Sequence, residues 1–431
     1  MLRLHCVAQN YAWGRLGKES EVAKLHSSGT GAIVTAATPY AELWMGTHPS
    51  GPSLVSFASD EAGAADNKLL LSSWLHQHPQ ALGSATQTKW HGELPFLFKI
   101  LSVNTALSIQ AHPDKKLAEA LHAERPNVYK DDNHKPEMAL ALTEFETLCS
   151  FVTTEELKSN LEAVPELAEV VGDAAVKAFL SAKDPKEGLK AAFTALMTSH
   201  KPAVEAALTK LVSRLSKIPD PSSTEKLILR LNEQYPGDVG VFCPYFLNYI
   251  TLSPGESIYL AANEPHAYLS GECVECMATS DNVVRAGLTP KLRDTDVLCS
   301  MLTYNQGKPE ILKGQPIDSH TRRYIPPFEE FEIDSIEVPK GTSYKLPFIP
   351  GPSIVLVQSG VGLATQGQGN AQRAFGVKKG DVFFLPAETP LELSASIEAA
   401  PSNGHVDAPL QVFRAGVNDK VFSPPCIEEN A

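Results

Sequence analysis

A weak internal repeat is the feature that most limits what this chain can fold into. Residues 255–260 (GESIYL) are echoed 125 residues later by residues 380–385 (GDVFFL). A Gly-acid turn leading into an alternating strand and a Pro-bearing turn is typical of a hairpin in a small closed β-barrel. We therefore predict two related barrels, with chance similarity as the alternative. His266 of the first copy corresponds to Leu391 of the second, so only the first offers a metal ligand there.

A block of helical periodicity interrupts the β-rich sequence. It begins at a capping-box pattern, Thr153-Thr154-Glu155-Glu156, and continues to about Tyr235 with apolar residues spaced three or four apart. Short strands with tight turns are expected on both sides, with one helix near residues 69–76. The predicted fold is mainly β with a helical insertion. Its predicted parts are 1–150 and 241–325 for the first barrel, 151–240 for the insertion, and 326–431 for the second barrel.

Composition excludes several classes of protein. The net charge is −13 with no block of basic residues, so a nucleic-acid partner is not expected, although a small anionic substrate is compatible. No apolar run approaches the ~20 residues that span a bilayer, so no membrane segment is expected. The seven cysteines are odd in number and lie mostly in apolar segments. Together with the lack of an apolar signal core near Met1, they favour a reducing, cytoplasmic location.

Strand alternation collects polar side chains on shared faces. The sets are Ser108, Gln110 and His112; Lys135 and Glu137; and His266 and Tyr268. Four of these residues supply two imidazoles, one carboxylate and one amide oxygen: Gln110, His112, Glu137 and His266. Such a set suits Zn²⁺, or with less selectivity Fe²⁺, Co²⁺ or Mn²⁺. Each histidine taken alone is more often a structural residue than a ligand.

Two further segments carry charges whose role the pattern leaves open. Arg285 and Lys291 share a Gly/Pro-shaped loop and could clamp a phosphate, but a surface loop with scattered charge is the simpler interpretation. Cys273 and Cys276 have metal-knuckle spacing without a second pair, so we interpret them as packing residues. Glu275 between them is, on the simpler interpretation, a carboxylate that faces solvent.

Seven motifs, in order along the chain, resemble those of type I phosphomannose isomerases. They are residues 11–14 (YAWG), 40–49 (YAELWMGTHP), 94–99 (LPFLFK), 108–113 (SIQAHP), 133–137 (NHKPE), 265–268 (PHAY) and 281–291 (DNVVRAGLTPK). The resemblance extends to about residue 291 and is loose in the helical block and after about residue 325. It implies a cupin-type (jelly-roll) catalytic barrel, a helical insertion and a second, metal-free cupin barrel.

The resemblance also implies an activity and its residues. It implies a zinc-dependent isomerase that interconverts mannose 6-phosphate and fructose 6-phosphate, with one Zn²⁺ per chain. The zinc ligands would be Gln110, His112, Glu137 and His266. Arg285 corresponds to the family's catalytic arginine, and Ser108 and Lys291 fall on positions associated with the substrate phosphate. Trp13 and Tyr268 are further candidates for substrate binding.

A proton must move between C1 and C2 of the sugar through an enediol. For its base we favour Glu275, with Lys135 and Asp281 as candidates for relaying protons to the oxygens; the sequence does not rank them. The expected partner is a small-molecule substrate, the expected state a monomer, and the expected role supply of mannose 6-phosphate for GDP-mannose, glycosylation and cell-wall mannan. Two alternatives stay open: a metal-dependent cupin oxygenase or decarboxylase, and a non-catalytic sugar-phosphate-binding bicupin.

Overall fold

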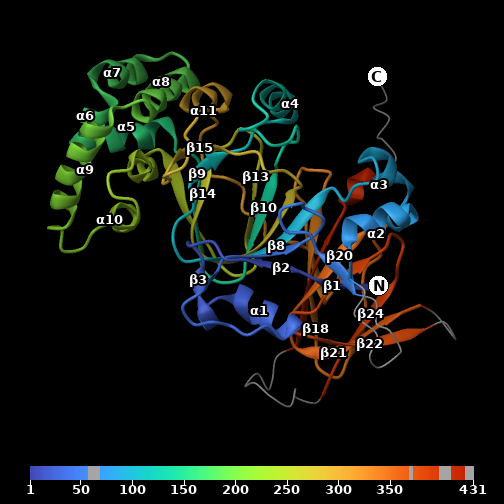
Figure 1. Ribbon diagram of the computed structural model, residues 1–431. Helices are drawn as coiled ribbons and strands as arrows, with labels where there is room; N and C mark the ends of the chain where they lie inside the picture. The colour runs from blue at the N-terminus through green and yellow to red at the C-terminus, as the bar shows by residue number, and fades with distance from the viewer. Residues whose placement is uncertain (57–67, 368–371, 398–408, 423–431) are drawn as a thin grey trace.

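The computed structural model describes residues 1–56, 68–367, 372–397 and 409–422. Its β-rich part is interrupted by a block of helices that lies at one end of the molecule in Figure 1. The helices of this block are α5 (Thr154–Ala163), α6 (Pro165–Val171), α7 (Asp173–Ser181), α8 (Pro185–Met197), α9 (Lys201–Leu215) and α10 (Ser223–Gln234). The predicted capping box is present, because Thr153 and Glu156 exchange side-chain-to-backbone hydrogen bonds. A mainly β fold with a helical insertion is therefore confirmed.

A ten-stranded antiparallel sheet forms the middle of the molecule, with β14 (His266–Ala278) at its centre. The main path also holds β12 (Leu247–Leu252), β11 (Phe145–Phe151), β8 (Phe96–Val103), β5 (Glu42–Met45) and β2 (Val7–Gln9). Branching from it are β10 (Glu137–Ala141), β13 (Ser257–Leu260), β9 (Ile109–Ala111) and β15 (Val284–Gly287). Because β14 pairs with β8, β9, β10 and β11, one strand gathers residues from distant parts of the chain.

The C-terminal strands lie at the opposite end from the helical block in Figure 1. A nine-stranded sheet contains β16 (Gln315–Pro316), β17 (Thr321–Tyr324), β18 (Glu332–Val338), β25 (Leu410–Gly416), β20 (Ser353–Ser359), β23 (Val382–Leu385), β1 (Leu2–His5), β6 (Leu54–Ser56) and β7 (Lys68–Leu70). Smaller sheets hold β19 (Ser343–Lys345), β24 (Leu391–Ala395), β21 (Val361–Gln366) and β22 (Arg373–Lys378), and the pair β3 (Arg15–Leu16) and β4 (Pro39–Tyr40).

Within the described residues no sheet closes into a barrel, so the predicted closed barrels are not found. The N-terminal strand β1 pairs with β23, and β6 pairs with β1. These N-terminal strands therefore extend the C-terminal sheet instead of closing the first one. The repeat nevertheless holds locally, since Gly255 and Gly380 both have φ +84° and lead into β13 and β23. His266 begins β14 and Leu391 begins β24, as the alignment of the repeat predicts.

More helices are present before residue 150 than the pattern predicts. The predicted helix is α2 (Leu71–Gln77), and the structure adds α1 (Glu21–Thr30), α3 (Ser84–Lys89) and α4 (Lys115–Glu124). Both α1 and α4 begin at side-chain caps, Ser20 and Asp114. They are only ten residues long, and helices this short depend on tertiary packing that periodicity does not reveal. One further helix, α11 (Thr295–Met301), lies after β15 in the predicted second part of the first barrel.

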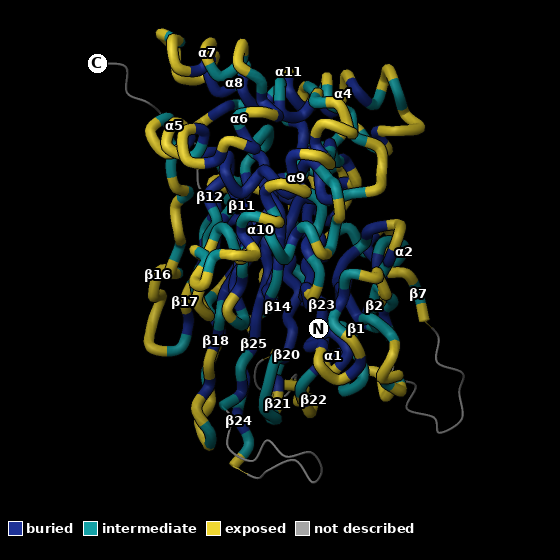
Figure 2. The backbone as a smooth tube through the Cα atoms, turned by 90° about the vertical axis from the view of Figure 1, so that its left-hand side faces the viewer, coloured by how far each residue is buried: buried dark blue, intermediate teal, exposed yellow. Residues whose placement is uncertain are grey.

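The core is continuous between the helical block and the central sheet. Figure 2 shows the central strands as dark blue, buried segments, with exposed backbone gathered on the helices and turns. The ring of Phe193 on α8 contacts Phe151 on β11 and Phe246, with ring centroids 5.1 and 5.7 Å apart. The insertion is thus packed against the sheet through aromatic contacts.

The six cysteines among the described residues are buried free thiols, including Cys273 and Cys276, while Cys426 lies outside those residues. No described helix is long and apolar enough to cross a membrane.

A bend in β14 sets which way its residues face. Strict alternation would put His266 and Glu275, nine residues apart, on opposite faces. The pairing of β14 with β11 shifts register between Tyr268 and Ser270, and Gly271 follows with φ +110°. A Cβ at Gly271 would lie 2.4 Å from the Glu144 carbonyl oxygen, so only glycine fits there.

Gly271→Ala is expected to destabilise the protein by about 2–4 kcal/mol, because it adds both a strained φ and a backbone clash. The measurement is the midpoint of thermal unfolding. Gly376→Ala is the control, since Gly376 lies in β22 with nothing within 4 Å of an added Cβ, and we expect little change. Equal unfolding temperatures for the two variants would contradict this explanation of the bend.

Candidate metal centre and active site

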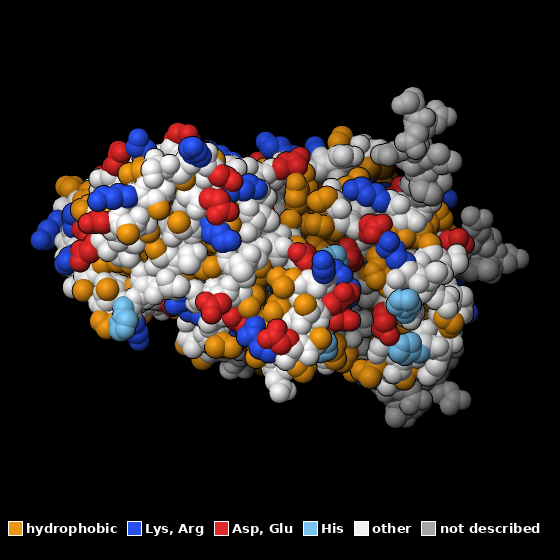
Figure 3. Space-filling model, turned by 90° about the horizontal axis from the view of Figure 1, so that it is seen from above, with side chains coloured by type: hydrophobic (Ala, Val, Ile, Leu, Met, Phe, Trp, Pro, Cys, Tyr) orange, Lys and Arg blue, Asp and Glu red, His pale blue; other side chains and the backbone are white. Residues whose placement is uncertain are grey.

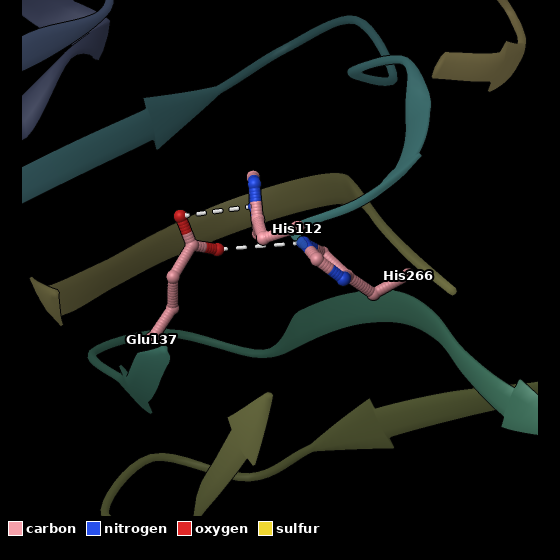
Figure 4. Close-up of side chains that lie close together, drawn as sticks. All are labelled: His112, Glu137 and His266. Carbon is pink, nitrogen blue, oxygen red and sulfur yellow. Dashed lines mark ion pairs between the residues drawn. The ribbon is translucent and has the colours of Figure 1, made fainter. Parts of the chain in front are cut away.

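Three buried side chains from separate strands or strand ends meet in the central sheet. His112 follows β9, Glu137 begins β10 and His266 begins β14. Figure 4 shows the two imidazoles on one side of the Glu137 carboxylate, each facing one of its oxygens; each Nε2 atom lies 3.4 Å from the oxygen that it faces. Their candidate ligand atoms all lie within 4.8 Å of one another.

Hydrogen bonds at the far side of each imidazole orient both rings. His112 Nδ1 lies 2.6 Å from the Asn282 carbonyl oxygen, and His266 Nδ1 lies 3.1 Å from the Glu264 carbonyl oxygen. A carbonyl only accepts, so Nδ1 carries a proton in both rings, and Nε2 is the ring atom of each histidine that can coordinate a metal beside Glu137. Both Nε2 atoms and one Glu137 oxygen are buried without a hydrogen-bond partner. Buried polar atoms of this kind call for a ligand.

The donor set and its spacing fit zinc. A tetrahedral site with bonds of ~2.0–2.1 Å has edges of about 3.3 Å, close to the two separations of 3.4 Å. Burial lowers the pKa of His112 to about 4, so its imidazole is neutral at physiological pH, as a ligand requires. Burial opposes ionisation of Glu137, but the adjacent Lys135 ammonium holds the pKa of Glu137 well below its usual range.

Gln110, the predicted fourth ligand, lies in the same row of side chains. It is opposite His266 on β14 and opposite Arg285 on β15. Directly opposite residues on adjacent strands point to the same face, which is also the face of His112 two residues further on. The Ser108 hydroxyl donates to Gln110 Oε1 at 3.4 Å. The structure thus brings Gln110, Ser108 and Arg285 to the edge of the metal centre.

A buried charge network lies beside the metal centre. Lys99 Nζ is 2.9 Å from the Glu275 carboxylate and 3.3 Å from that of Glu42. All three residues are at most 8% exposed, so the interpretation of Glu275 as a solvent-facing carboxylate is wrong. Glu275 is opposite Ala139 on β10, two residues from Glu137 and on its face. Burial raises the pKa of Glu275, although Lys99 opposes this.

Lys99 is one of the residues at this site, with Glu42 and His48, whose role the sequence did not indicate. It lies in β8, whose eight residues are all buried. Burial opposes its charge, yet Glu275 and Glu42 raise the pKa of Lys99 above its ordinary value. A single lysine inside a continuous apolar run is the signal that could have found it, because buried lysines require a charged partner.

The two candidate proton relays differ in their surroundings. Lys135 Nζ lies 3.1 Å from Glu137 Oε1, next to the metal centre, and its side chain is largely buried. Asp281 is more exposed, and its carboxylate lies 3.3 Å from the Nε2 atom of buried His48. The hydrogen bond from His48 lowers the pKa of Asp281 despite partial burial.

Two cations at this edge lack acidic partners within the described part of the chain. The structure records no ion pair for Arg285 or Lys291 there, and burial lowers the pKa of Arg285. Lys291 is exposed, six residues after Arg285. Half-buried and exposed cations without carboxylate partners are suited to an anionic ligand.

The two remaining candidates for substrate binding, Tyr268 and Trp13, belong to a packed apolar cluster. Tyr268 is buried with its hydroxyl unpartnered, and Trp13 is half-buried in contact with the same apolar cluster. The Trp13 carbonyl accepts hydrogen bonds from the Asn104 and Thr105 amides at 3.0 and 3.1 Å. Neither residue contacts the metal-ligand atoms through a hydrogen bond among the described residues.

Models of two protein domains match the chain. The catalytic domain of type I phosphomannose isomerase matches residues 1–154, and the helical insertion domain of the same family matches residues 156–247. Mannose-6-phosphate isomerase 2 of Arabidopsis thaliana is 47% identical over 429 residues, covering 97% of this chain and 94% of that protein. This chain belongs to the type I phosphomannose isomerase family. It is an enzyme, and the isomerase is confirmed over the two alternatives that the sequence left open.

Other proteins similar to this chain are also phosphomannose isomerases by name. The mannose-6-phosphate isomerase of Homo sapiens is 43% identical over 409 residues, covering 90% of this chain and 94% of that protein. A crystal structure of a mannose 6-phosphate isomerase with zinc bound has a TM-score of 0.79 at 29% identity, covering 97% of this chain and 99% of that one. A variant phosphomannose isomerase from Salmonella typhimurium has a TM-score of 0.80 at 27% identity, with the same coverage.

In this phosphomannose isomerase, His266→Ala is expected to lower zinc affinity at least 100-fold, because it removes a candidate ligand that the buried site cannot replace. Zinc per chain, measured by elemental analysis after dialysis, is the readout. His76→Ala is the control, since His76 is an exposed histidine paired with Glu93. Full zinc content in His266→Ala would exclude it as a ligand.

Proposed function

We propose that the chain is a zinc-dependent aldose–ketose isomerase that interconverts D-mannose 6-phosphate and D-fructose 6-phosphate through a cis-enediol intermediate. The observation that carries this proposal is the cluster of unpartnered ligand atoms of His112, Glu137 and His266 beside a buried carboxylate. The names of the relatives and the zinc-bound structure support the substrate and the metal. Gln110 completes the proposed ligand set, with one Zn²⁺ per chain.

The chemical step moves a proton between C2 and C1 of the open-chain sugar. Glu275 is the proposed base: its carboxylate takes the proton from one carbon, leaving an enediolate. The enediolate becomes the enediol when its charged oxygen gains a proton, and Glu275 then returns its proton to the other carbon as the hydroxyl oxygen of the enediol gives one up. Its burial supports this assignment, because a carboxylate whose pKa is raised is a stronger base. Lys99 holds the carboxylate in place and compensates its charge.

Charge develops on the sugar oxygens as the carbon loses its proton. Arg285 is proposed to face these oxygens, since it shares a row with Gln110 and has no acidic partner within the described residues. Each ~1.4 kcal/mol of such stabilisation gives about a tenfold rate increase. Zinc, when bound, supplies Lewis-acid polarisation of substrate oxygens without redox chemistry.

Proton transfer between the two oxygens needs a group that can both donate and accept. Lys135 is favoured over Asp281 for this role, because Lys135 lies beside Glu137 whereas the Asp281 carboxylate is paired with His48. Ser108 and Lys291 are proposed to bind the phosphate, which supplies binding energy remote from the reacting carbons. Trp13 and Tyr268 are proposed to line the sugar site.

The wider setting is also part of the proposal. The two β-rich parts are proposed to be cupin-type jelly rolls built from stacked sheets, at 1–150 with 241–325 and at 326–431, around the insertion at 151–240. The second one is proposed to bind no metal, because Leu391 takes the place of His266 in the repeat. A monomer in the cytoplasm is proposed, with free thiols supporting a reducing compartment. Its product would supply GDP-mannose synthesis, glycosylation and cell-wall mannan.

Removing the metal tests the proposed function directly. Mannose 6-phosphate turnover is measured in the purified protein, after chelation and dialysis, and after zinc is restored. We expect activity to be lost and then regained with zinc. Full activity in metal-free protein would contradict the zinc dependence.

Glu275→Gln is expected to lower kcat by about 10²–10⁴ because the amide cannot accept the proton. Zinc content should stay at the wild-type value, since Glu275 is not a proposed ligand. Steady-state kinetics with mannose 6-phosphate provides the measurement.

Glu272→Gln is the matched control. Glu272 is another buried glutamate on β14, but it lies three residues earlier and bonds to the Ser102 hydroxyl and the Glu21 amide, which a glutamine oxygen also accepts. It should retain wild-type kcat. Turnover at the wild-type rate in Glu275→Gln would remove Glu275 as the base.

A further inference from the structure

The Asp238 carboxylate of the helical insertion contacts the turn that follows β15. Asp238 precedes the 3₁₀ helix η3 (Val239–Tyr245) and lies within the matched insertion domain. Its Oδ1 accepts hydrogen bonds from the backbone amides of Gly240 and Leu288, both at 2.7 Å. Its Oδ2 accepts from the Thr289 amide at 3.2 Å. The carboxylate therefore joins the insertion to the turn that follows β15.

The backbone at this junction is tightly packed. A Cβ on Gly287 would lie 2.6 Å from Gly240 Cα, and a Cβ on Gly240 would lie 2.6 Å from the Leu288 amide nitrogen. Leu288 itself has φ +53°, a left-handed conformation that is costly for a leucine. Two hydrogen bonds from the turn to Asp238 offset that cost and hold the chain in a single path.

The backbone path of this turn determines the position of Lys291. The Lys291 amide donates to the Thr289 hydroxyl at 3.1 Å, so Lys291 is tied to a residue that Asp238 holds. Arg285 lies on β15 just before the turn, and Arg293 just after it donates to the Met197 carbonyl of the insertion at 2.9 Å. The segment that joins the two proposed substrate cations is thus anchored to the insertion on both sides of Lys291.

We propose that Asp238 is a positioning residue for the substrate phosphate: by fixing the turn at Leu288 and Thr289, it holds Lys291 where the phosphate of the sugar binds. This proposal rests on the proposed role of Lys291. It gives the helical insertion a part in substrate recognition. Asp238 itself does not contact the substrate in this proposal.

The test compares Asp238→Ala, Lys291→Ala and the double variant. Asp238→Ala should raise KM for mannose 6-phosphate about tenfold or more, with kcat changed much less and zinc content unchanged. The inhibition constant of inorganic phosphate, used as a competitive probe, should rise by a similar factor. Because Asp238 acts through Lys291, the double variant should have nearly the KM of Lys291→Ala alone.

Two further variants separate positioning from general stability. Asp238→Asn retains an oxygen that can accept from the Gly240 and Leu288 amides, so this variant should fold. Its NH₂ group cannot accept from the Thr289 amide, so KM should rise, but by a smaller factor than in Asp238→Ala. Asp184→Ala removes a comparable cap in the insertion, where Asp184 accepts from the Lys186 amide at 2.9 Å, far along the chain from the turn. It should leave KM and phosphate inhibition unchanged.

The outcomes distinguish this proposal from the one on which it rests. If Lys291→Ala raises KM and weakens phosphate inhibition but neither Asp238 variant does so, the positioning role is overturned and the phosphate role of Lys291 stands. Multiplicative effects in the double variant would also overturn it, since Asp238 would then act independently of Lys291. If Lys291→Ala changes neither quantity, the phosphate assignment fails and the positioning role fails with it.

Discussion

The active site depends on burying the Glu137 carboxylate beside two imidazoles. Removing a carboxylate from water costs several kcal/mol unless charge and hydrogen bonds compensate it. Lys135 supplies one positive charge, but the neutral imidazole of His112 supplies none. The remaining compensation is a divalent cation in our proposal. A site of this kind tolerates little movement, which explains why its ligands begin or follow strands that all hydrogen-bond to β14.

The same strand brings the proposed chemistry to the metal. β14 carries His266 at its start and Glu275 near its end, and Gly271 bends the strand between them. Pairing with β10 places Glu275 on the face of the sheet that carries Glu137. Pairing with β8 places Glu275 directly opposite Lys99. The proposed base and the proposed ligand are therefore held by one backbone, and their separation does not depend on a flexible loop. The loop that carries Lys291 lacks this support, and the insertion provides it through Asp238.

The sequence predicted the helical insertion and its capping box because both are local patterns of spacing. It predicted His112, Glu137 and His266 from alternation and ligand chemistry, and family resemblance supplied Arg285 and Lys291. It missed Lys99, because a lysine in an apolar run shows no partner until the strands pair. It missed α1 and α4, whose ten residues depend on packing. It also placed the N-terminal strands in a closed first barrel, whereas long-range pairing joins β1 to β23.

The sequence by itself determined the helical insertion with its capping box and which side chains could bind a metal, since both follow from residue type and from spacings of two to four residues. Only the tertiary structure decided that the three candidate ligands converge, although His112 and His266 lie 154 residues apart in the sequence. It also decided that Glu275 is buried on the same face of the sheet as these residues. Strict alternation puts Glu275 and His266 on opposite faces of the sheet, and the register shift before Gly271 brings them to the same face. The physical reason is that the neighbouring strands, and not the adjacent residues in the sequence, determine which face of a bent strand a side chain points to and whether it is buried.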